Sequence, residues 1–384
     1  MRILRWVLLV VIIGLIAARM IVPGMVEDSH NKVLRPGPYR ASPQAEALHK
    51  KLLVADLHAD SLLWDRNLLK RSTHGHVDIP RLGEANVALQ AFTIVTTAPK
   101  KLNIVRNSDD TDQIRNIALA QTWPPRTWNS PKQRAIYQAE KLEKFAASSG
   151  GKLVVIKSRA DLQNFLATRH PGQVAGFLGA EGAQPLEGDL ANLDDLYAAG
   201  IRMMAPTHFT DTAVGGAAAG MKKSGLTDFG RRWVKEMESR KMIIDLAHAS
   251  HATLADVTAM ATRPLLISHT GVKGTCDNNR NLTDDELRAI ARSGGVIGIG
   301  LWETATCGTD ARATARAMAY AAKIVGVERV ALGSDNDGGT TQPFDVTGLV
   351  LVTEALMSEG FSEHDIQLIM GGNVARLLLQ TLPD

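Results

Sequence analysis

Potential metal ligands and acids close several short apolar runs of this 384-residue chain. A single histidine at such a place is more often a structural residue whose ring nitrogens are hydrogen-bonded. Several histidines and carboxylates at the ends of separate strands favour a shared metal site instead. The residues in question are His58, Asp60, Glu181, His208, His248, His269 and Asp335.

The spacing of these residues suggests how two cations could be held. His58 and Asp60 are two residues apart, so both side chains leave the same face of an extended strand and can hold one cation. Glu181 follows a glycine-rich run, and its two carboxylate oxygens could bridge two cations. His248 and His269 offer imidazole nitrogens, which suit a borderline metal such as zinc. The pattern therefore predicts a two-metal site with five protein ligands.

A second histidine pair, His74 and His76, has the spacing of a metal-binding pair but a different context. No apolar run precedes the pair, and Gly75 lies inside it. We therefore expect a surface or rim loop here rather than metal ligands.

The elements that must position the site follow a strand–helix alternation from residue 52 onward. Eight such alternations predict an α/β fold, a (β/α)8 TIM-like barrel whose active site lies at the carboxyl ends of the strands. A further apolar run, 153–156, is assigned to an insertion between strands 2 and 3. The eight predicted strands are 52–58, 89–95, 174–181, 201–208, 242–248, 264–269, 296–302 and 330–335.

The N-terminal hydrophobic segment indicates export. Residues 6–18 are uninterrupted apolar residues behind Arg2 and Arg5, a length typical of a signal peptide, whose core has about 7–15 residues. Read through to Val22, with Arg19 as the only interruption, residues 6–22 could instead remain as an uncleaved anchor. We expect residues 1–22 to be a signal-anchor or signal peptide and the proline-containing residues 23–45 to be a tether. Residues 46–384 would then form the barrel domain on the periplasmic or extracytoplasmic face.

Composition excludes some classes of function. The 43 Lys and Arg residues exceed the 40 Asp and Glu residues by three, and Arg2, Arg5 and Arg19 account for this excess. The neutral remainder argues against nucleic-acid binding. Cys276 and Cys307 are too few for a disulfide-built scaffold, and they could form one pair or stay as free thiols.

Taken together, the motifs resemble those of the membrane dipeptidase family, also called renal dipeptidases, within the metal-dependent amidohydrolase superfamily. The resemblance spans roughly residues 50–380 and implies two Zn²⁺ ions bridged by Glu181. His58 and Asp60 would complete the first metal site, and His248 and His269 the second. The segments that carry the resemblance are LHAD followed by a tryptophan, AEG, PTH, IDLAH, ISH, NNRNLTDDEL, LGSDNDG and GGNVARLL.

The same resemblance implies roles for other residues. The substrate-binding histidine falls on His208, the carboxylate-binding arginine on Arg280 and the proton-transferring acid on Asp335. It also implies a disulfide between Cys276 and Cys307. Its other implications are small dipeptide substrates and a membrane-attached protein, with a homodimer left open as the oligomeric state.

Two departures from the family pattern leave the substrate open. The family's glycine pair after the bridging glutamate, often followed by histidine, is here Gly182-Ala183-Gln184, and Trp64 lies one residue further from Asp60 than in the mammalian pattern. Two alternatives therefore stand beside a dipeptidase. One is a related binuclear-metal hydrolase of another small amide, lactone or ester, and the other is a non-catalytic biosynthetic accessory protein with the same fold.

Overall fold

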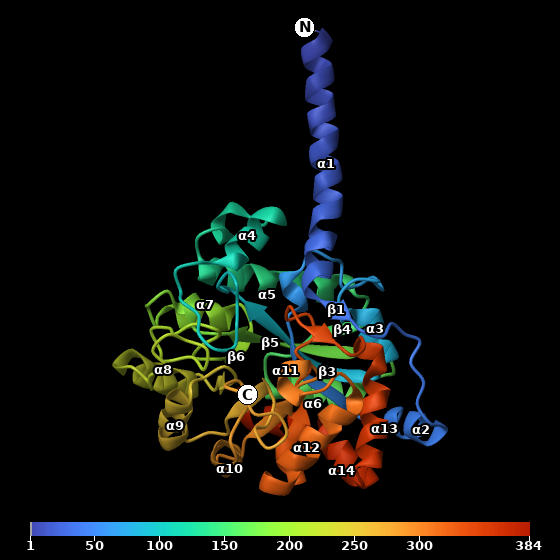
Figure 1. The fold of residues 1–384 in the computed structure, drawn as a ribbon, viewed down its shortest axis with the longest axis vertical. Coiled ribbons are helices and arrows are strands. Elements are labelled where there is room, and N and C mark those ends of the chain that lie inside the picture. Colours follow the sequence, from blue (N-terminus) through green and yellow to red (C-terminus); the bar gives the residue numbers. More distant parts are fainter. Residues whose placement is uncertain (1) are drawn as a thin grey trace.

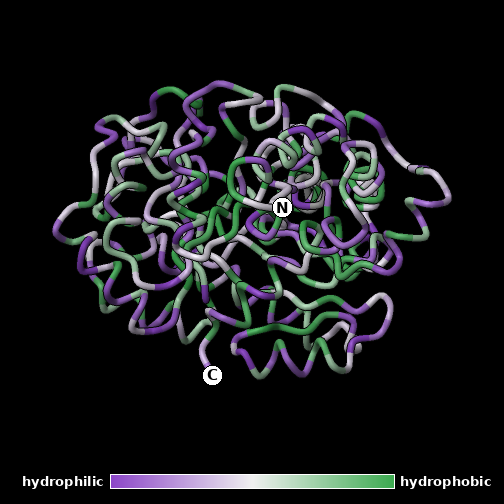
Figure 2. Tube along the Cα trace, turned by 90° about the horizontal axis from the view of Figure 1, so that it is seen from below, coloured by the Kyte–Doolittle hydropathy of each residue, from purple (hydrophilic) through white to green (hydrophobic). Residues whose placement is uncertain are grey.

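The computed structural model describes residues 2–384, apart from the side chains of residues 2, 15–18 and 20. Parallel strands surrounded by helices form the body of the fold, and helix α1 (Arg2–His30) projects from it (Figure 1). Hydrophobic segments run through the middle of this body, and hydrophilic segments follow many of the outer loops (Figure 2).

Two parallel sheets contain the strands at the centre of the fold. Their strand orders are β2-β3-β5-β6-β7 and β10-β9-β8. Isolated parallel bridges, Ala59 to Asn336 and Asp245 to Leu266, join the edges of the two sheets. The predicted α/β class is confirmed, and the curled parallel sheet is consistent with a TIM-like barrel. The strands are β1 (Lys32–Val33), β2 (Val54–Ala59), β3 (Val87–Val95), β4 (Leu153–Val155), β5 (Val174–Glu181), β6 (Ile201–Met204), β7 (Ile243–Ile244), β8 (Leu266–Thr270), β9 (Val296–Ile299), β10 (Val330–Leu332) and β11 (Thr341–Gln342).

Helices separate most of the strands, as the alternation in the sequence predicts. The capping-box spacing at Thr283 does begin a helix, because the Thr283 hydroxyl and the Glu286 carboxylate satisfy each other's backbone N–H groups. The helices after α1 are α2 (Pro43–His49), α3 (Ile79–Glu84), α4 (Gln113–Ala120), α5 (Pro131–Ser148), α6 (Arg159–Thr168), α7 (Asn192–Ala198), α8 (Asp228–Ser239), α9 (His251–Met260), α10 (Asp284–Arg292), α11 (Glu303–Thr306), α12 (Ala311–Val325), α13 (Val350–Ser358), α14 (Glu363–Gln367) and α15 (Asn373–Thr381).

The strands that carry the site are buried on both faces. Every residue of β2, β3 and β5 is buried, which explains why these segments read as continuous apolar runs rather than as alternating ones. Strand β4 pairs with the first half of β5, and α4, α5 and β4 all lie between β3 and β5. The predicted insertion is therefore present at the predicted place.

The N-terminal region differs from the expected tether. Residues 23–30 continue helix α1, and β1 pairs with β11 in parallel. Glu27 is buried and forms an ion pair with Arg66. Sequence patterns did not show this docking because it uses an ion pair and backbone hydrogen bonds rather than a periodic apolar face.

Among the described residues, we find no helix with the length and apolar character that crossing a membrane requires. The side chains of residues 15–18 and 20, which belong to the predicted signal or anchor, lie outside the described part of the chain.

A disulfide joins Cys276 to Cys307, with the two Cα atoms 5.3 Å apart. This confirms the pairing that the family resemblance implies. Cys276 belongs to the loop after β8, and Cys307 ends helix α11 after β9, so the bond ties two neighbouring loops at the carboxyl ends of the strands.

Replacing both cysteines with serine should lower the free energy of unfolding by about 3–4 kcal/mol, because the cross-link restricts the unfolded chain. The bond spans 31 positions of the sequence. Urea unfolding of the oxidised protein and of the double variant measures the difference. Equal free energies of unfolding, or free thiols at both positions in exported wild-type protein, would contradict the assignment.

Candidate metal centre

The structure brings the sequence-predicted site residues together at one end of the sheet. Each comes from the carboxyl end of a strand or from the loop that follows it, where parallel strands direct side chains towards a common place. The contributors are His58 and Asp60 from β2, Glu181 from β5, His208 after β6, His248 after β7, His269 from β8 and Asp335 after β10.

Carboxylates surround the imidazole of His58. Its Nε2 atom lies 3.5 Å from Glu181 Oε1, 3.6 Å from Asp60 Oδ1 and 4.0 Å from Asp335 Oδ1. Burial by itself lowers the pKa of His58, but the charges of Glu181 and Asp60 outweigh burial and raise that pKa to about 10. This part of the site therefore requires positive charge.

Two further imidazoles converge on the same glutamate. The Nε2 atoms of His248 and His269 lie 3.0 Å from each other, and 3.0 Å and 3.4 Å from Glu181 Oε1. Burial lowers the pKa of each of these histidines well below its usual value, so both rings are neutral and can offer a lone pair. Burial, and then the charge of Asp60, raise the pKa of Glu181.

These donors fit a divalent cation. His58 Nε2 and Asp60 Oδ1 are buried and have no hydrogen-bond partner among the described residues. Unpaired buried polar atoms are costly, and a cation would satisfy them. Mixed imidazole and carboxylate donors suit a metal such as zinc. Three sets of possible ligands have donor atoms within 4.8 Å of one another: His58, Asp60 and Glu181; Glu181, His208 and His248; and His58, His269 and Asp335.

A serine that sequence analysis missed orients two of the histidines. Ser268 Oγ lies 3.0 Å from His58 Nδ1 and 2.9 Å from His269 Nδ1, so both rings turn their Nε2 atoms towards Glu181. The backbone N–H of Ser268 donates to Asp245 Oδ1 at 2.8 Å. The only sequence signal for Ser268 is its place directly before His269 in an apolar run.

The backbone is strained at two of the site residues. His248 has φ 64° and Asp335 has φ 60°, a left-handed conformation that costs a residue other than glycine about 1–3 kcal/mol. Hydrogen bonds hold each in place, and the carbonyl of Asp335 accepts from Thr340 Oγ1 at 2.8 Å. A Cβ atom on Gly338 would lie 2.1 Å from Asp335 Oδ1, so only glycine allows this loop to pass the carboxylate.

Asp335 and His208 have the protonation behaviour of reactive groups. Burial raises the pKa of Asp335 to about 7, although the charge of His58 opposes the rise. Burial lowers the pKa of His208 to about 3, so its ring is neutral, and its Nε2 atom lies 3.2 Å from Glu181 Oε2. A carboxyl group with a pKa near neutrality can both accept and return a proton.

A cavity of about 580 Å³ opens onto these groups, and Arg280 lines its wall. The Arg280 side chain is buried, and its Nη2 atom donates to the carbonyl of His269 at 2.9 Å. The Arg280 guanidinium carbon lies 5.8 Å from the centre of the Trp302 ring. A buried cation at the wall of a cavity is suited to an anionic ligand group.

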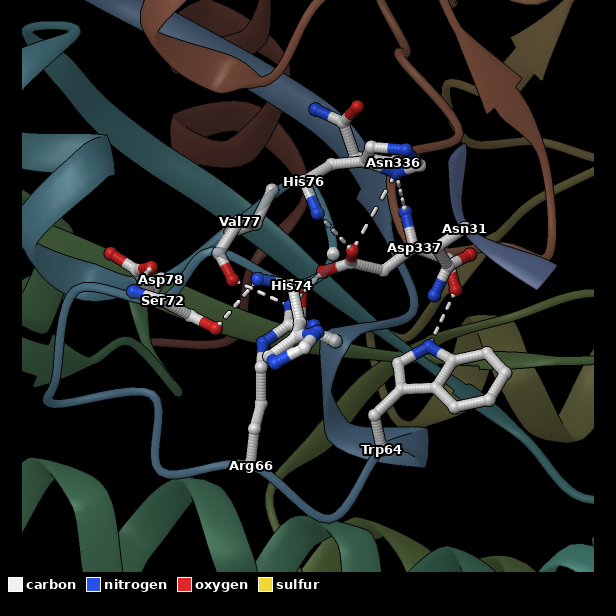
Figure 3. A network of polar contacts seen from close by, with 12 residues as sticks. Asn31, Trp64, Arg66, Ser72, His74, His76, Val77, Asp78, Asn336 and Asp337 are labelled. Carbon is white, nitrogen blue, oxygen red and sulfur yellow. Dashed lines mark hydrogen bonds and ion pairs between the residues drawn. The ribbon is translucent and has the colours of Figure 1, made fainter. Parts of the chain in front are cut away.

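The prediction that His74 and His76 lie in a surface or rim loop is wrong for His76. His76 is fully buried. Its backbone N–H donates to Asp337 Oδ1 at 2.6 Å, and its ring Nδ1 atom accepts from the backbone N–H of Asp337 at 2.8 Å (Figure 3). Arg66 pairs with the same carboxylate, and Trp64 donates to the Asp337 carbonyl at 2.7 Å. His74 is exposed, as expected. The buried Asp337 explains the difference, because its carboxylate requires donors.

A half-buried lysine supports the loop after β2. Lys141 Nζ donates to the carbonyls of Leu62 and Trp64 at 2.7 Å and 2.6 Å. Burial lowers the pKa of Lys141 to about 7. Nothing in the sequence around Lys141 distinguishes it from a surface lysine on helix α5, so sequence analysis missed it.

The fold and the cluster define a class of protein: an α/β protein with a candidate metal centre at the carboxyl ends of its parallel strands. A family model described as membrane dipeptidase (peptidase family M19) matches residues 42–382. The chain belongs to this family.

Relatives and solved structures agree with this membership. The chain is 27% identical to mouse Dipeptidase 3 over 323 residues, which are 80% of this chain and 63% of that protein, so it spans less than two thirds of the mouse relative. It is also 27% identical to Dipeptidase aclJ of Aspergillus oryzae over 375 residues, which are 90% of this chain and 84% of the relative.

A metallopeptidase from Rhodobacter sphaeroides, liganded with a phosphinate mimic of the dipeptide L-Ala-D-Ala, superposes with a TM-score of 0.72 at 25% identity. The match covers 86% of this chain and 99% of that one. The probable dipeptidase PvdM from Pseudomonas aeruginosa has the same TM-score at 20% identity, over 88% of this chain and 98% of that chain, and shows the shared fold.

Glu181→Gln should reduce the metal content of the purified protein, because one oxygen of a central carboxylate becomes a neutral amide nitrogen. We expect wild-type protein to hold about two divalent ions per chain. Elemental analysis after dialysis measures the content, and His170→Ala, which changes an exposed histidine, serves as the control. Full metal content in Glu181→Gln would show that Glu181 is not a ligand.

Proposed function

We propose that this protein is a metal-dependent dipeptidase, which hydrolyses the peptide bond of short peptides with a free carboxyl terminus. The observation that carries the proposal is one cavity onto which Asp60, Asp335 and Arg280 all open. The proposed metal ligand Asp60, the proposed proton carrier Asp335 and the proposed carboxylate-binding Arg280 line one space. Membership of the membrane dipeptidase family supports the same reaction.

The proposal includes two Zn²⁺ ions. His58, Asp60 and Glu181 would hold the first, and Glu181, His248 and His269 the second. When bound, such ions polarise the substrate carbonyl and lower the pKa of water. The short distances from Glu181 to the three imidazoles, 3.0–3.5 Å, support its role as the shared ligand.

Two residues would handle the proton and the developing charge. Asp335 would accept the proton of the attacking water and return it to the leaving amine, and its pKa of about 7 suits both steps. The neutral ring of His208 would donate an N–H to the oxyanion of the tetrahedral intermediate.

Arg280 would bind the terminal carboxylate of the substrate. A guanidinium group matches a carboxylate with two parallel hydrogen bonds, which fixes the distance from the terminus to the scissile bond. Its buried position at the cavity wall supports this role. This pairing would restrict the enzyme to short peptides.

The two alternatives make different demands on these residues. A hydrolase of an uncharged amide, lactone or ester has no need of Arg280. A non-catalytic accessory protein has no need of a complete ligand set around Glu181, yet that set is present and buried. The substrate test below separates the first alternative from a dipeptidase, and the absence of any turnover would favour the second.

Export and membrane attachment form a second part of the proposal. The Cys276–Cys307 disulfide hints at an extracellular or secreted protein, because such bonds form in oxidising compartments. We propose that residues 6–22 direct export and hold the protein at the periplasmic or extracytoplasmic face. Exposed apolar side chains on α1, such as Trp6 and Ile12, support this attachment. Assembly as a homodimer stays a prediction.

Asp335→Asn should slow turnover by about 10²–10⁴-fold, because an amide cannot carry the proton. Metal content should stay at the wild-type level, since the proposal places Asp335 outside the five ligands. Steady-state kinetics with elemental analysis measure both quantities. Asp285→Asn, which changes a highly exposed aspartate, is the control. A near-normal kcat for Asp335→Asn would make Asp335 a structural residue.

The carboxylate clamp gives the direct test of the proposed substrate. Wild-type protein should cleave free dipeptides and leave their C-terminal amides nearly intact, because remote binding energy helps to align the scissile carbonyl. Arg280→Ala should reduce the difference between the two rates by slowing cleavage of the free dipeptides. Arg280→Lys should restore little of that cleavage, since the point charge of lysine does not reproduce the planar guanidinium. Arg288→Ala, on the outer face of α10, is the control. Equal cleavage of acids and amides by metal-loaded wild-type protein would favour the amide, lactone or ester hydrolase.

A further inference from the structure

The cavity has a wall residue from outside the region that the family model matches. That match begins at residue 42, yet His30, the last residue of helix α1, lines the same cavity as Asp60 and Asp335. The lining also includes apolar Leu63, Ile114 and Ile117, together with polar Gln113 and Lys101. The segment before the family domain therefore contributes to the candidate active site.

The part of the cavity wall on helix α4 lies on the opposite side of the curled sheet from Arg280. In the strand order that the bridges join, β3 and β8 are separated by β5, β6 and β7 on one side and by β2, β10 and β9 on the other. Arg280 follows β8, whereas Ile114 and Ile117 lie on α4, in the insertion after β3. A dipeptide whose carboxylate pairs with Arg280 and whose peptide bond lies at the cluster would extend its N-terminal side chain towards Ile114 and Ile117.

Hydrogen bonds on both nitrogens fix the ring of His30. Its Nδ1 atom lies 2.8 Å from the carbonyl oxygen of Val26, which can only accept, so Nδ1 is the donor. Its Nε2 atom lies 3.0 Å from the side-chain amide nitrogen of Gln113 on helix α4, which donates to it. The centre of the His30 ring lies 5.7 Å from that of Trp64. The ring thus forms a fixed part of the wall between α1 and α4.

The end of α1 is itself anchored to the body of the fold. Buried Glu27 pairs with Arg66, and Arg66 pairs with Asp337, the aspartate at the centre of the network in Figure 3. Asn31 Oδ1 accepts from the N–H of Gly339 at 2.9 Å, and Gly339 also lines the cavity. These contacts connect the position of His30 to the loop that carries Asp335.

We propose that His30 completes an apolar subsite for the N-terminal side chain of the substrate. The inference rests on the proposed dipeptidase function and names the substrate class: dipeptides with a large apolar residue, such as leucine or phenylalanine, before the scissile bond. His30 is a specificity-determining residue in this proposal. It holds no metal and transfers no proton.

The test compares full-length wild-type protein with His30→Ala on Gly-Ala, Leu-Ala and Phe-Ala. Wild-type protein should prefer the two apolar substrates. His30→Ala should lower kcat/KM for these two about tenfold and leave Gly-Ala within about twofold, which is the range of discrimination that apolar contacts provide. Ile114→Ala, on the α4 part of the wall, should produce the same pattern.

His74→Ala is the matched control, because His74 contacts Asp28 on the same helix, at 2.7 Å, and does not line the cavity. An equal loss on all three substrates in His30→Ala, or no loss, would overturn the subsite, as would a wild-type enzyme indifferent to the N-terminal residue. Failure of metal-loaded wild-type protein to cleave any dipeptide would refute the proposed function instead.

Calorimetric binding of phosphinate mimics of Phe-Ala and Gly-Ala tests the subsite separately from turnover. A preference for the Phe-Ala mimic that His30→Ala removes would support the subsite, and equal affinities for the two mimics would overturn it.

Discussion

The rest of the site depends on the electrostatics around Glu181. This carboxylate is buried beside Asp60, with Asp335 nearby, and its Oε1 atom faces the Nε2 atoms of His58, His248 and His269. Buried like charges and unpaired lone pairs are unfavourable unless positive charge compensates them. Divalent cations would compensate both. The same cations would also bring the substrate's scissile carbonyl and the attacking water close to Asp335.

A second buried aspartate ties the N-terminal segment to this site. Asp337 lies two residues after Asp335, and burial alone would raise its pKa. The charge of Arg66, with hydrogen bonds from the Ser61 hydroxyl and the backbone N–H of His76, keeps that pKa below its usual value. Arg66 also pairs with Glu27 near the end of α1. One ion network therefore fixes both the loop that carries the proposed proton carrier and the helix end that carries His30. The proposed specificity of the pocket follows from that connection.

Much of the fold and the placement of the residues around Glu181 could be predicted, because these residues end or directly follow apolar runs. Arg280, in a polar loop, was indicated only by the family resemblance. Burial makes such a run a parallel strand, and strands of this kind meet at their carboxyl ends, as His58 and Glu181 do. The contacts that sequence reasoning missed join polar residues far apart in the chain. Ser268 orients His58 across 210 positions, and Arg66 reaches Asp337 across 271. Such pairs have no periodicity that one sequence could reveal.

The most direct test of the account is the thermal stability of the full-length protein with and without metal. A cation that binds the native cluster and not the unfolded chain raises Tm as its concentration rises. Chelator-treated protein should therefore melt at a lower temperature than wild type, and titration with Zn²⁺ should restore Tm and saturate at about two ions per chain. An unchanged Tm, with no zinc bound at saturation, would contradict the central claim that this buried cluster is a metal centre.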